Sequence, residues 1–125
     1  MSRLLVDTHA LLWWLTDDAA LSTAAREAIA DPANEPIVSA ASVWEIAIKR
    51  SLGKLQAPED LPALISEEGF QWLAIGVDHA WRVHGLPMHH GDPFDRLLVA
   101  QALTEGLAII TKDPWFAAYG AAVIW

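Results

Sequence analysis

The stretch that decides the fold reads His89-His90-Gly91-Asp92-Pro93-Phe94-Asp95-Arg96-Leu97-Leu98-Val99-Ala100-Gln101-Ala102. Pro93 lacks an N–H and has a fixed φ, which favours the first position of a helix. Asp92 is therefore the predicted N-cap, accepting a hydrogen bond from the backbone N–H three residues later. Asp95 then lies on the first turn, at the edge of the apolar face of the helix. Unless Arg96 or Lys112 reaches it, this half-buried carboxylate needs a cation.

Outside this stretch, short apolar runs alternate with amphipathic helical segments. Strands are predicted at residues 4–6, 36–39, 70–75, 107–110 and 122–125. Helices are predicted at residues 10–15 and after the caps Ser22, Ser42, Asp60, Asp78, Asp92 and Asp113. Continuous apolar strands of this kind are typical of parallel sheets covered by helices on both faces. The predicted fold is α/β: a single three-layer αβα domain over residues 1–125, with an open parallel sheet and right-handed crossovers.

The composition limits the class of protein. A chain of 125 residues can bury roughly two-thirds of its unfolded surface. With 54% hydrophobic and 19% charged residues it is not a disordered chain. The absence of cysteine excludes disulfides and thiolate chemistry. No apolar run approaches the ~20 residues of a membrane span, and the short apolar start does not resemble a signal peptide. We therefore expect a soluble cytoplasmic protein without a membrane partner.

Four acids are placed by the predicted strands and helices toward one edge of the sheet. Asp7, Glu45 and Asp113 each come just after a predicted strand, and Asp95 opens the helix that leads into another. In open parallel sheets, ligands bind outside the carboxyl ends of the strands. Clustered carboxylates repel each other unless a cation joins them. Hard oxygen ligands favour Mg²⁺ or Mn²⁺.

Each acid also has an ordinary structural explanation. Asp7 and Asp113 could cap helices, and Asp95 could favour the positive end of a helix. Glu45 fits a Ser42-x-x-Glu45 capping box. Caps draw freely on Ser, Thr and Asn, however, so four acids at these positions favour a shared site.

The histidines and basic residues give weaker signals. His84, His89, His90 and Asp92 could suggest zinc, but their spacing matches no common zinc signature and cysteine is absent. Lys49 and Arg50 follow Glu45 by about one turn, and Arg96 follows Asp95. These basic residues could contact phosphate, although Lys49 could equally form an i,i+4 pair with Glu45. The net charge of −8 is opposite to the usual basic signature of nucleic-acid binding.

Taken together, the motifs resemble a PIN-domain protein, most closely the VapC-type toxins of type II toxin–antitoxin systems. The resemblance spans the whole chain and rests on four segments in the order of the family: Val6-Asp7-Thr8-His9-Ala10-Leu11-Leu12-Trp13, Ser42-Val43-Trp44-Glu45-Ile46-Ala47-Ile48-Lys49, Asp92-Pro93-Phe94-Asp95-Arg96-Leu97-Leu98 and Thr111-Lys112-Asp113. It implies a flavodoxin-like αβα core and a Mg²⁺- or Mn²⁺-dependent endoribonuclease.

The resemblance also implies particular residues and partners. It carries the catalytic acids onto Asp7, Glu45, Asp95 and Asp113, with Thr111 as a supporting hydrogen-bond donor. Of these acids, Asp7 and Asp95 are the expected metal ligands. The candidate RNA-binding residues are Lys49, Arg50 and Arg96. Asp92 is an additional acid, expected to cap its helix and available for an outer contact with the metal. A homodimer is expected, inhibited by a small antitoxin whose basic side chains enter the acidic site, which fits the charge of −8. The expected substrate is structured RNA such as tRNA.

Rival hypotheses come from other classes of protein. A receiver-like signalling module is also small, acidic and α/β, but it would place two adjacent acids after the first strand, where this chain has Asp7-Thr8. A phosphatase with a nucleophilic aspartate would have a second Asp where His9 stands. A catalytically inactive interaction domain is the remaining alternative.

Overall fold

Five parallel strands form the centre of the protein in a computed structural model that describes residues 2–125. The strands are β1 (Arg3–Val6), β2 (Glu35–Ser39), β3 (Gln71–Leu73), β4 (Ala108–Ile110) and β5 (Val123–Ile124). Their order in the sheet is β3-β2-β1-β4-β5, and every pair is parallel. The predicted α/β fold with an open parallel sheet is confirmed. The strand predicted at 70–75 is shorter in the structure.

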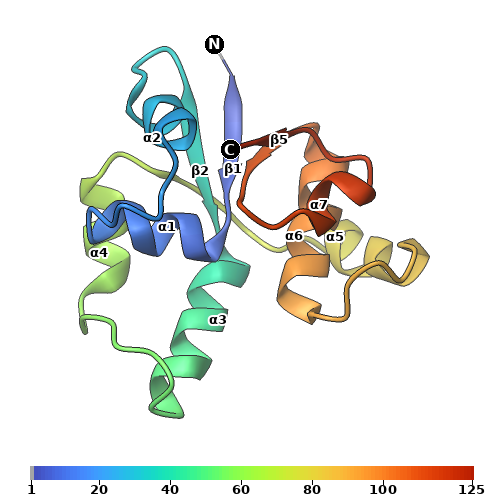
Figure 1. The fold of residues 1–125 in the computed structure, drawn as a ribbon. Helices are drawn as coiled ribbons and strands as arrows, with labels where there is room; N and C mark the ends of the chain where they lie inside the picture. Colours follow the sequence, from blue (N-terminus) through green and yellow to red (C-terminus); the bar gives the residue numbers. More distant parts are fainter. Residues whose placement is uncertain (1) are drawn as a thin grey trace.

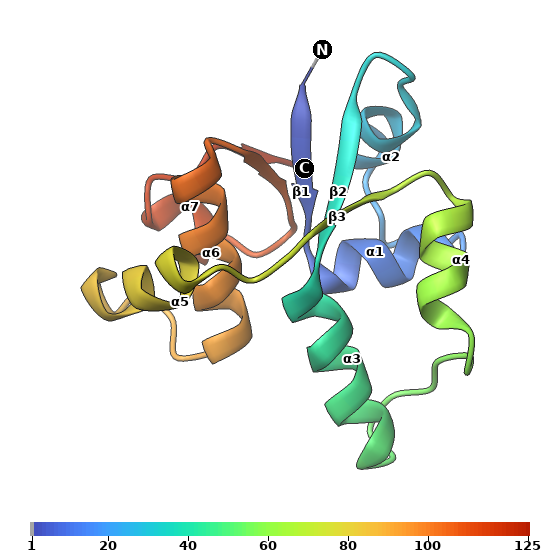
Figure 2. The ribbon, with the colours of Figure 1, turned by 180° about the vertical axis from the view of Figure 1, so that it is seen from behind.

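Helices cover both faces of this sheet. They are α1 (Thr8–Leu15), α2 (Thr23–Ala30), α3 (Ala40–Ser51), α4 (Leu61–Glu67), α5 (Val77–Arg82), α6 (Pro93–Glu105) and α7 (Trp115–Ala118), with a 3₁₀ turn η1 (Val83–Gly85) after α5. In Figure 1, α1, α2 and α4 lie on one side of the strands, and α5, α6 and α7 lie on the other. The reverse view in Figure 2 shows the same division, with α3 extending beyond the end of β2.

The alternation of side chains along the strands builds a separate core on each face. Leu4 and Val6 of β1 pack with buried residues of α1, α2 and α4. Leu5, between them, packs on the opposite face with Leu98 and Val99 of α6. A strand buried on both faces has to be apolar at every position, which explains the continuous apolar runs in the sequence.

The strand order creates a switch point beside β1. The chain moves outward from β1 to β2 and β3, then returns to place β4 on the other side of β1. Loops after β1 and β4 therefore diverge at the carboxyl ends of these two neighbours, leaving a crevice where α/β proteins commonly bind ligands. Asp7 directly follows β1, and Thr111 directly follows β4.

The helix starts agree with the predicted caps at α2, α4 and α6 and differ at α3, α5 and α7. The N-cap of α7 is Pro114, one residue after the predicted cap Asp113. Asp92 caps α6, with Pro93 as the first helical residue, as predicted. The Ser42–Glu45 capping box was wrong: α3 begins at Ala40 and is capped by Ser39, so Ser42 and Glu45 lie inside the helix. Asp78 is likewise not a cap, because α5 begins at Val77 and Asp78 lies in its first turn.

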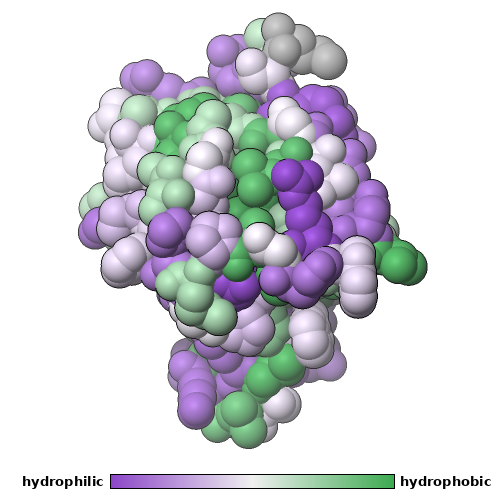
Figure 3. Space-filling view, turned by 90° about the vertical axis from the view of Figure 1, so that its right-hand side faces the viewer, coloured by the Kyte–Doolittle hydropathy of each residue, from purple (hydrophilic) through white to green (hydrophobic). Residues whose placement is uncertain are grey.

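The surface on the side of α5, α6 and α7 is mixed. Apolar areas occupy part of its upper half, surrounded by hydrophilic side chains (Figure 3). Another apolar area lies at the lowest point of this view, where the end of α3 projects. Across residues 2–125, no helix combines the length and the apolar character that crossing a membrane requires.

Candidate active site

Asp7 is fixed at the end of β1 by two hydrogen bonds. One carboxylate oxygen, Oδ1, accepts from the backbone N–H of Ala10 at 2.7 Å, so Asp7 caps α1 as well as lying at the rim. The other, Oδ2, accepts from the hydroxyl of Thr111 at 2.5 Å. Burial raises the pKa of Asp7 above its ordinary value, although the hydrogen bonds from Thr111 and Ala10 act in the opposite direction. The expected hydrogen bond from Thr111 is thus present.

Glu45 reaches the same region from α3. It is buried, and its two oxygens accept hydrogen bonds at 2.7 Å from the Thr8 hydroxyl and the Lys49 ammonium. The hydrogen bond to Glu45 also raises the pKa of Lys49. Because a charge without partners would be costly at this depth, these two contacts explain how an acid is tolerated in the middle of a helix.

Asp92 and Asp95 lie together at the start of α6. Oδ1 of Asp92 accepts from the backbone N–H groups of Phe94 at 2.8 Å and Asp95 at 3.0 Å, which confirms its expected capping role. The Asp95 carboxylate stays out of the cap and is about three-quarters buried, with its side chain 24% exposed. Burial raises the pKa of Asp95 to about 7, and the negative charges of four neighbouring acids add to this rise: Asp92, Glu45, Asp7 and Asp113.

Asp113 comes from the loop after β4. Its backbone N–H donates to Thr111 Oγ1 at 3.0 Å, which turns the chain toward the rim. The imidazole of His90 stands between Asp113 and Asp95, with Nε2 at 3.3 Å from Asp113 Oδ2 and 3.4 Å from Asp95 Oδ2. These three side chains place ligand atoms close enough together to hold one metal ion.

A cavity of about 430 Å³ opens over this cluster. Three of the predicted acids line it: Asp7, Asp95 and Asp113. Its other walls are His9, Trp13, Lys112 and Pro114, so an aromatic ring and a cation stand beside the carboxylates. Glu45 acts on Asp95 through its charge but does not line the cavity. The predicted acids therefore converge at one edge of the sheet.

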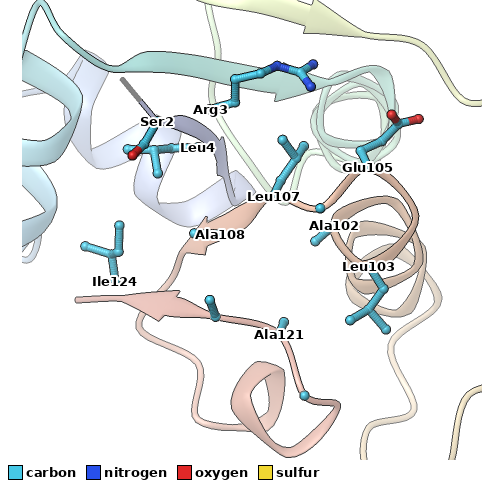
Figure 4. A pocket seen from close by; sticks show the side chains of 13 residues that line it. Ser2, Arg3, Leu4, Ala102, Leu103, Glu105, Leu107, Ala108, Ala121 and Ile124 are labelled. Carbon is cyan, nitrogen blue, oxygen red and sulfur yellow. The ribbon is translucent and has the colours of Figure 1, made fainter.

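A larger cavity, of about 690 Å³, lies at the opposite edge of the sheet, against the start of β1 and β4 (Figure 4). The labelled side chains in this view are mostly apolar, such as Leu107 and Ile124, and the charged ones are Arg3 and Glu105. Glu105 is the one acidic residue that lines this larger cavity, so the cavity contains no cluster of acids. The smaller cavity is therefore the candidate active site.

The structure assigns structural contacts to the three candidate RNA-binding residues. Lys49 forms the i,i+4 pair with Glu45. Arg50 binds the Ala57 carbonyl and the Glu59 carboxylate, on the loop beyond α3. Arg96 is only 8% exposed, and its guanidinium donates to backbone carbonyls of the segment before α6. This burial contradicts the expected contact between Arg96 and RNA.

Two contributors to the site were missed by the sequence reasoning. Thr8 supplies the hydroxyl that holds Glu45, and nothing in the sequence separates it from an ordinary first-turn residue. His90 was weighed only for zinc, yet it stands among the acids. His90 lies two residues before the helix cap Asp92, and this position next to the start of the acidic helix is the feature of the sequence that could have indicated its role.

The fold and the acidic cluster together define the class of protein: a small αβα protein with an acidic site at the carboxyl ends of its central parallel strands. Residues 4–122 match the PIN domain family, and the chain belongs to this family. This assignment replaces the receiver-like alternative.

Individual relatives agree with this assignment. The chain is 32% identical over 116 residues to Ribonuclease VapC22 of Mycobacterium tuberculosis (strain ATCC 25618 / H37Rv), covering 90% of this chain and 88% of the relative. In structure it is similar to VapBC2 of Rickettsia felis bound to a promoter DNA fragment, with a TM-score of 0.72, 10% identity and coverage of 97% and 96%. It is also similar to the DNA-bound VapBC of Salmonella typhimurium, with a TM-score of 0.71, 16% sequence identity, and coverage of 98% of this chain and 97% of that chain. At these identities the structural likeness shows the fold.

Proposed function

We propose that this protein is an endoribonuclease that requires Mg²⁺ or Mn²⁺ and acts as the toxin of a toxin–antitoxin pair. The observation that carries the proposal is the convergence of Asp7, Asp95 and Asp113 on one cavity, with Glu45 within electrostatic reach of Asp95. The ribonuclease named among its relatives supports the activity, and the VapBC complexes among its structural neighbours support the pairing with an antitoxin.

The residues present fit a divalent ion. Oxygen is the only donor type that the predicted acids offer, as Mg²⁺ and Mn²⁺ prefer. Burial and mutual repulsion raise the pKa of Asp95 to about 7, so ionising this group calls for a nearby positive charge. Asp7 and Asp95 would hold the ion, and Asp113 would complete the cluster. Glu45, with an oxygen bound to Thr8 and the other to Lys49, would act through water.

The reaction proposed is hydrolysis of an RNA phosphodiester by water. A bound divalent ion supplies the positive charge that stabilises the phosphoryl oxygens and makes the attacking water more acidic. Asp7 is held in place by Thr111 and the Ala10 N–H, so the acid is pre-positioned before substrate arrives. The attacking water loses a proton to solvent as its oxygen bonds to phosphorus, the bond between phosphorus and the 3′ oxygen breaks, and the departing 3′ oxygen takes up a proton. Attack by water leaves 5′-phosphate and 3′-hydroxyl ends.

Electrostatics constrain how the partners bind. The chain carries a net charge of −8, so a polyanion is attracted locally by the metal site and by Lys112, which lines the cavity. The same acids suit a small antitoxin that inserts Arg or Lys side chains among them. We further propose that the protein is a homodimer in the cytoplasm and that structured RNA such as tRNA is its substrate.

Cleavage assays test the function directly. Wild type, Asp7→Asn and Asp95→Asn are incubated with RNA in Mg²⁺ or in excess EDTA, with Asp60→Asn as a matched control on the exposed surface. Cleavage is expected for wild type and the control in Mg²⁺, with a loss of at least about 100-fold in both site variants. Equal cutting by all four proteins, or products ending in a cyclic 2′,3′-phosphate, would contradict the proposal. A wild type that never cuts would favour the inactive interaction domain.

A further inference from the structure

His90 occupies the gap between two parts of the acidic site. Asp95 belongs to the first turn of α6, whereas Asp113 belongs to the loop after β4. His90 Nε2 is almost equally distant from the two, at 3.4 Å and 3.3 Å from their Oδ2 atoms. One imidazole edge thus faces both carboxylates.

The orientation of this ring determines which nitrogen carries the proton. His90 Nδ1 accepts a hydrogen bond from the backbone N–H of Asp92 at 2.9 Å. A ring nitrogen that accepts cannot carry the proton of the neutral imidazole, so the proton lies on Nε2. The Nε2–H group, which carries the positive end of the ring dipole, therefore lies on the edge of the ring that is within 3.4 Å of both carboxylates, and its contact with Asp95 and Asp113 is electrostatic.

The backbone of His90 is held as firmly as its ring. Its N–H donates to the Tyr119 hydroxyl at 2.8 Å, and its carbonyl accepts from the same hydroxyl at 3.4 Å and from Arg96 at 3.5 Å. Arg96 also donates to the Tyr119 hydroxyl, at 3.2 Å. The edge of the Trp115 ring packs against the imidazole. These contacts leave the imidazole little freedom.

We propose that His90 is a positioning residue of the metal site: the partial positive charge of its Nε2–H group, close to both carboxylates, keeps Asp95 and Asp113 in the arrangement that binds the ion, while His90 itself stays outside the coordination shell. This inference rests on the proposed metal-dependent function and adds a residue to it. Groups that orient metal ligands from outside the coordination shell contribute about 10- to 100-fold to metal affinity.

The alternative role of His90, direct coordination, conflicts with its hydrogen bonding. To bind a metal, Nε2 must be free of its proton, which would then have to lie on Nδ1. Nδ1 would face the Asp92 N–H as a second donor, and the 2.9 Å hydrogen bond would be lost. Mg²⁺ and Mn²⁺ also gain less from an imidazole than from carboxylate and water oxygens.

Substitutions that imitate one ring nitrogen at a time separate these roles. In His90→Asn the shorter side chain can still accept from Asp92 N–H but does not reach the carboxylates. In His90→Gln the amide N–H reaches the position of Nε2. His84→Asn is the matched control, because His84 is exposed, its ring contacts Trp81, and it does not line the cavity over the acids. The probe is Mn²⁺ alone, titrated against each metal-free protein and followed by calorimetry.

We expect the Mn²⁺ affinity of His90→Asn to fall by about 10- to 100-fold, that of His90→Gln to recover most of the loss, and that of His84→Asn to equal wild type. Pulsed paramagnetic resonance of Mn²⁺-loaded wild type should show no directly bonded nitrogen. Directly bonded nitrogen that disappears in His90→Asn would overturn the positioning role, as would equal affinities for all four proteins. A wild type that binds no Mn²⁺ would overturn the proposed function as well.

Tyr119→Phe gives an independent variant that leaves every site carboxylate and His90 intact. It removes the hydroxyl that holds the His90 backbone. Mn²⁺ affinity should fall in the same direction as for His90→Asn, and the double variant should bind no more weakly than His90→Asn alone, because the two residues act along one path. Additive losses of affinity would show that Tyr119 acts independently of His90, and would contradict the proposal that the Tyr119 hydroxyl works by holding the His90 backbone.

Discussion

At the scale of the residue, Asp95 combines a requirement of function with a cost in stability. Its carboxyl is buried beside other acids, and burial together with their charges raises its pKa from 3.8 to about 7. The folded protein therefore holds this proton more tightly than the unfolded chain does. The contribution of this proton to the free energy of unfolding is fully present below pH 3.8 and is lost as the pH rises through about 7, the pKa of Asp95 in the folded protein.

Asp95→Asn should therefore stabilise the metal-free protein. At pH 8 the substitution removes a charge that the fold accommodates poorly, and we expect the free energy of unfolding to rise by roughly 1–2 kcal/mol after allowance for solvent screening. At pH 4 the wild-type carboxyl is already protonated, so the gain should nearly vanish. Urea denaturation in EDTA at both pH values measures it. A gain of the same size at pH 4 would contradict the electrostatic origin.

Metal binding should be coupled to the loss of the same proton. Because ligands bind metal in their deprotonated form, the affinity for Mg²⁺ should rise as the pH increases through about 7 and level off above it. Calorimetry at pH 6 in buffers of different ionisation enthalpy should detect a released proton, and at pH 8.5 almost none. Affinity that is constant between these pH values would show that Asp95 is not a ligand.

At the scale of the element, the start of α6 does two jobs. Asp92 caps the helix through backbone N–H groups, and its charge is the next largest cause, after burial, of the raised pKa of Asp95.

Asp92→Ala should lower the free energy of unfolding by about 1 kcal/mol through loss of the cap. Asp92→Asn should keep the cap and lower the pH at which Asp95 ionises. Thermal unfolding and the pH dependence of Mg²⁺ affinity measure the two effects, and identical behaviour of the variants would contradict this separation.

Local patterns predicted the elements well where one local interaction decides them. The Asp92-Pro93 pair fixes the start of α6, and the apolar runs identify strands that are buried on both faces. The Ser42–Glu45 box failed because Ser39 already caps α3 and because Ser42 and Glu45 both lie near Thr8, from a distant part of the chain.

The sequence indicated the acids of the candidate site and two of its supporting contacts, the donor Thr111 and the cap Asp92, but not the roles of Thr8 and His90. Four acids follow from their places after strands and at a helix start. Arg96 and His90 could not be assigned, because their roles depend on Tyr119 and on carbonyls of the segment before α6. These contacts join residues that are far apart in the sequence, so no periodic pattern of residues reveals them. The family resemblance does not reveal them either, because it covers only the residues in the motifs.

At the scale of the whole molecule, a divalent ion should stabilise the fold. An ion that binds the native protein alone adds about 2.7 kcal/mol at a concentration of 100 times its dissociation constant. Saturating Mn²⁺ should therefore raise the Tm of wild type by several degrees. Asp7→Asn combined with Asp95→Asn should abolish the increase, and KCl at equal ionic strength is the control. An increase that survives in the double variant would place the stabilising ion elsewhere.

The hydrogen bond between Thr111 and Asp7 joins residues that are 104 positions apart. β1 pairs with β2, the next strand along the chain, but its other neighbour, β4, is synthesised only after β2 and β3. A growing chain therefore carries Asp7, Glu45 and Asp95 before the segment that completes their cluster exists. The proposed cleavage should therefore arise only after β4 and Thr111 have been synthesised, so a nascent chain that still lacks them should be unable to cut RNA.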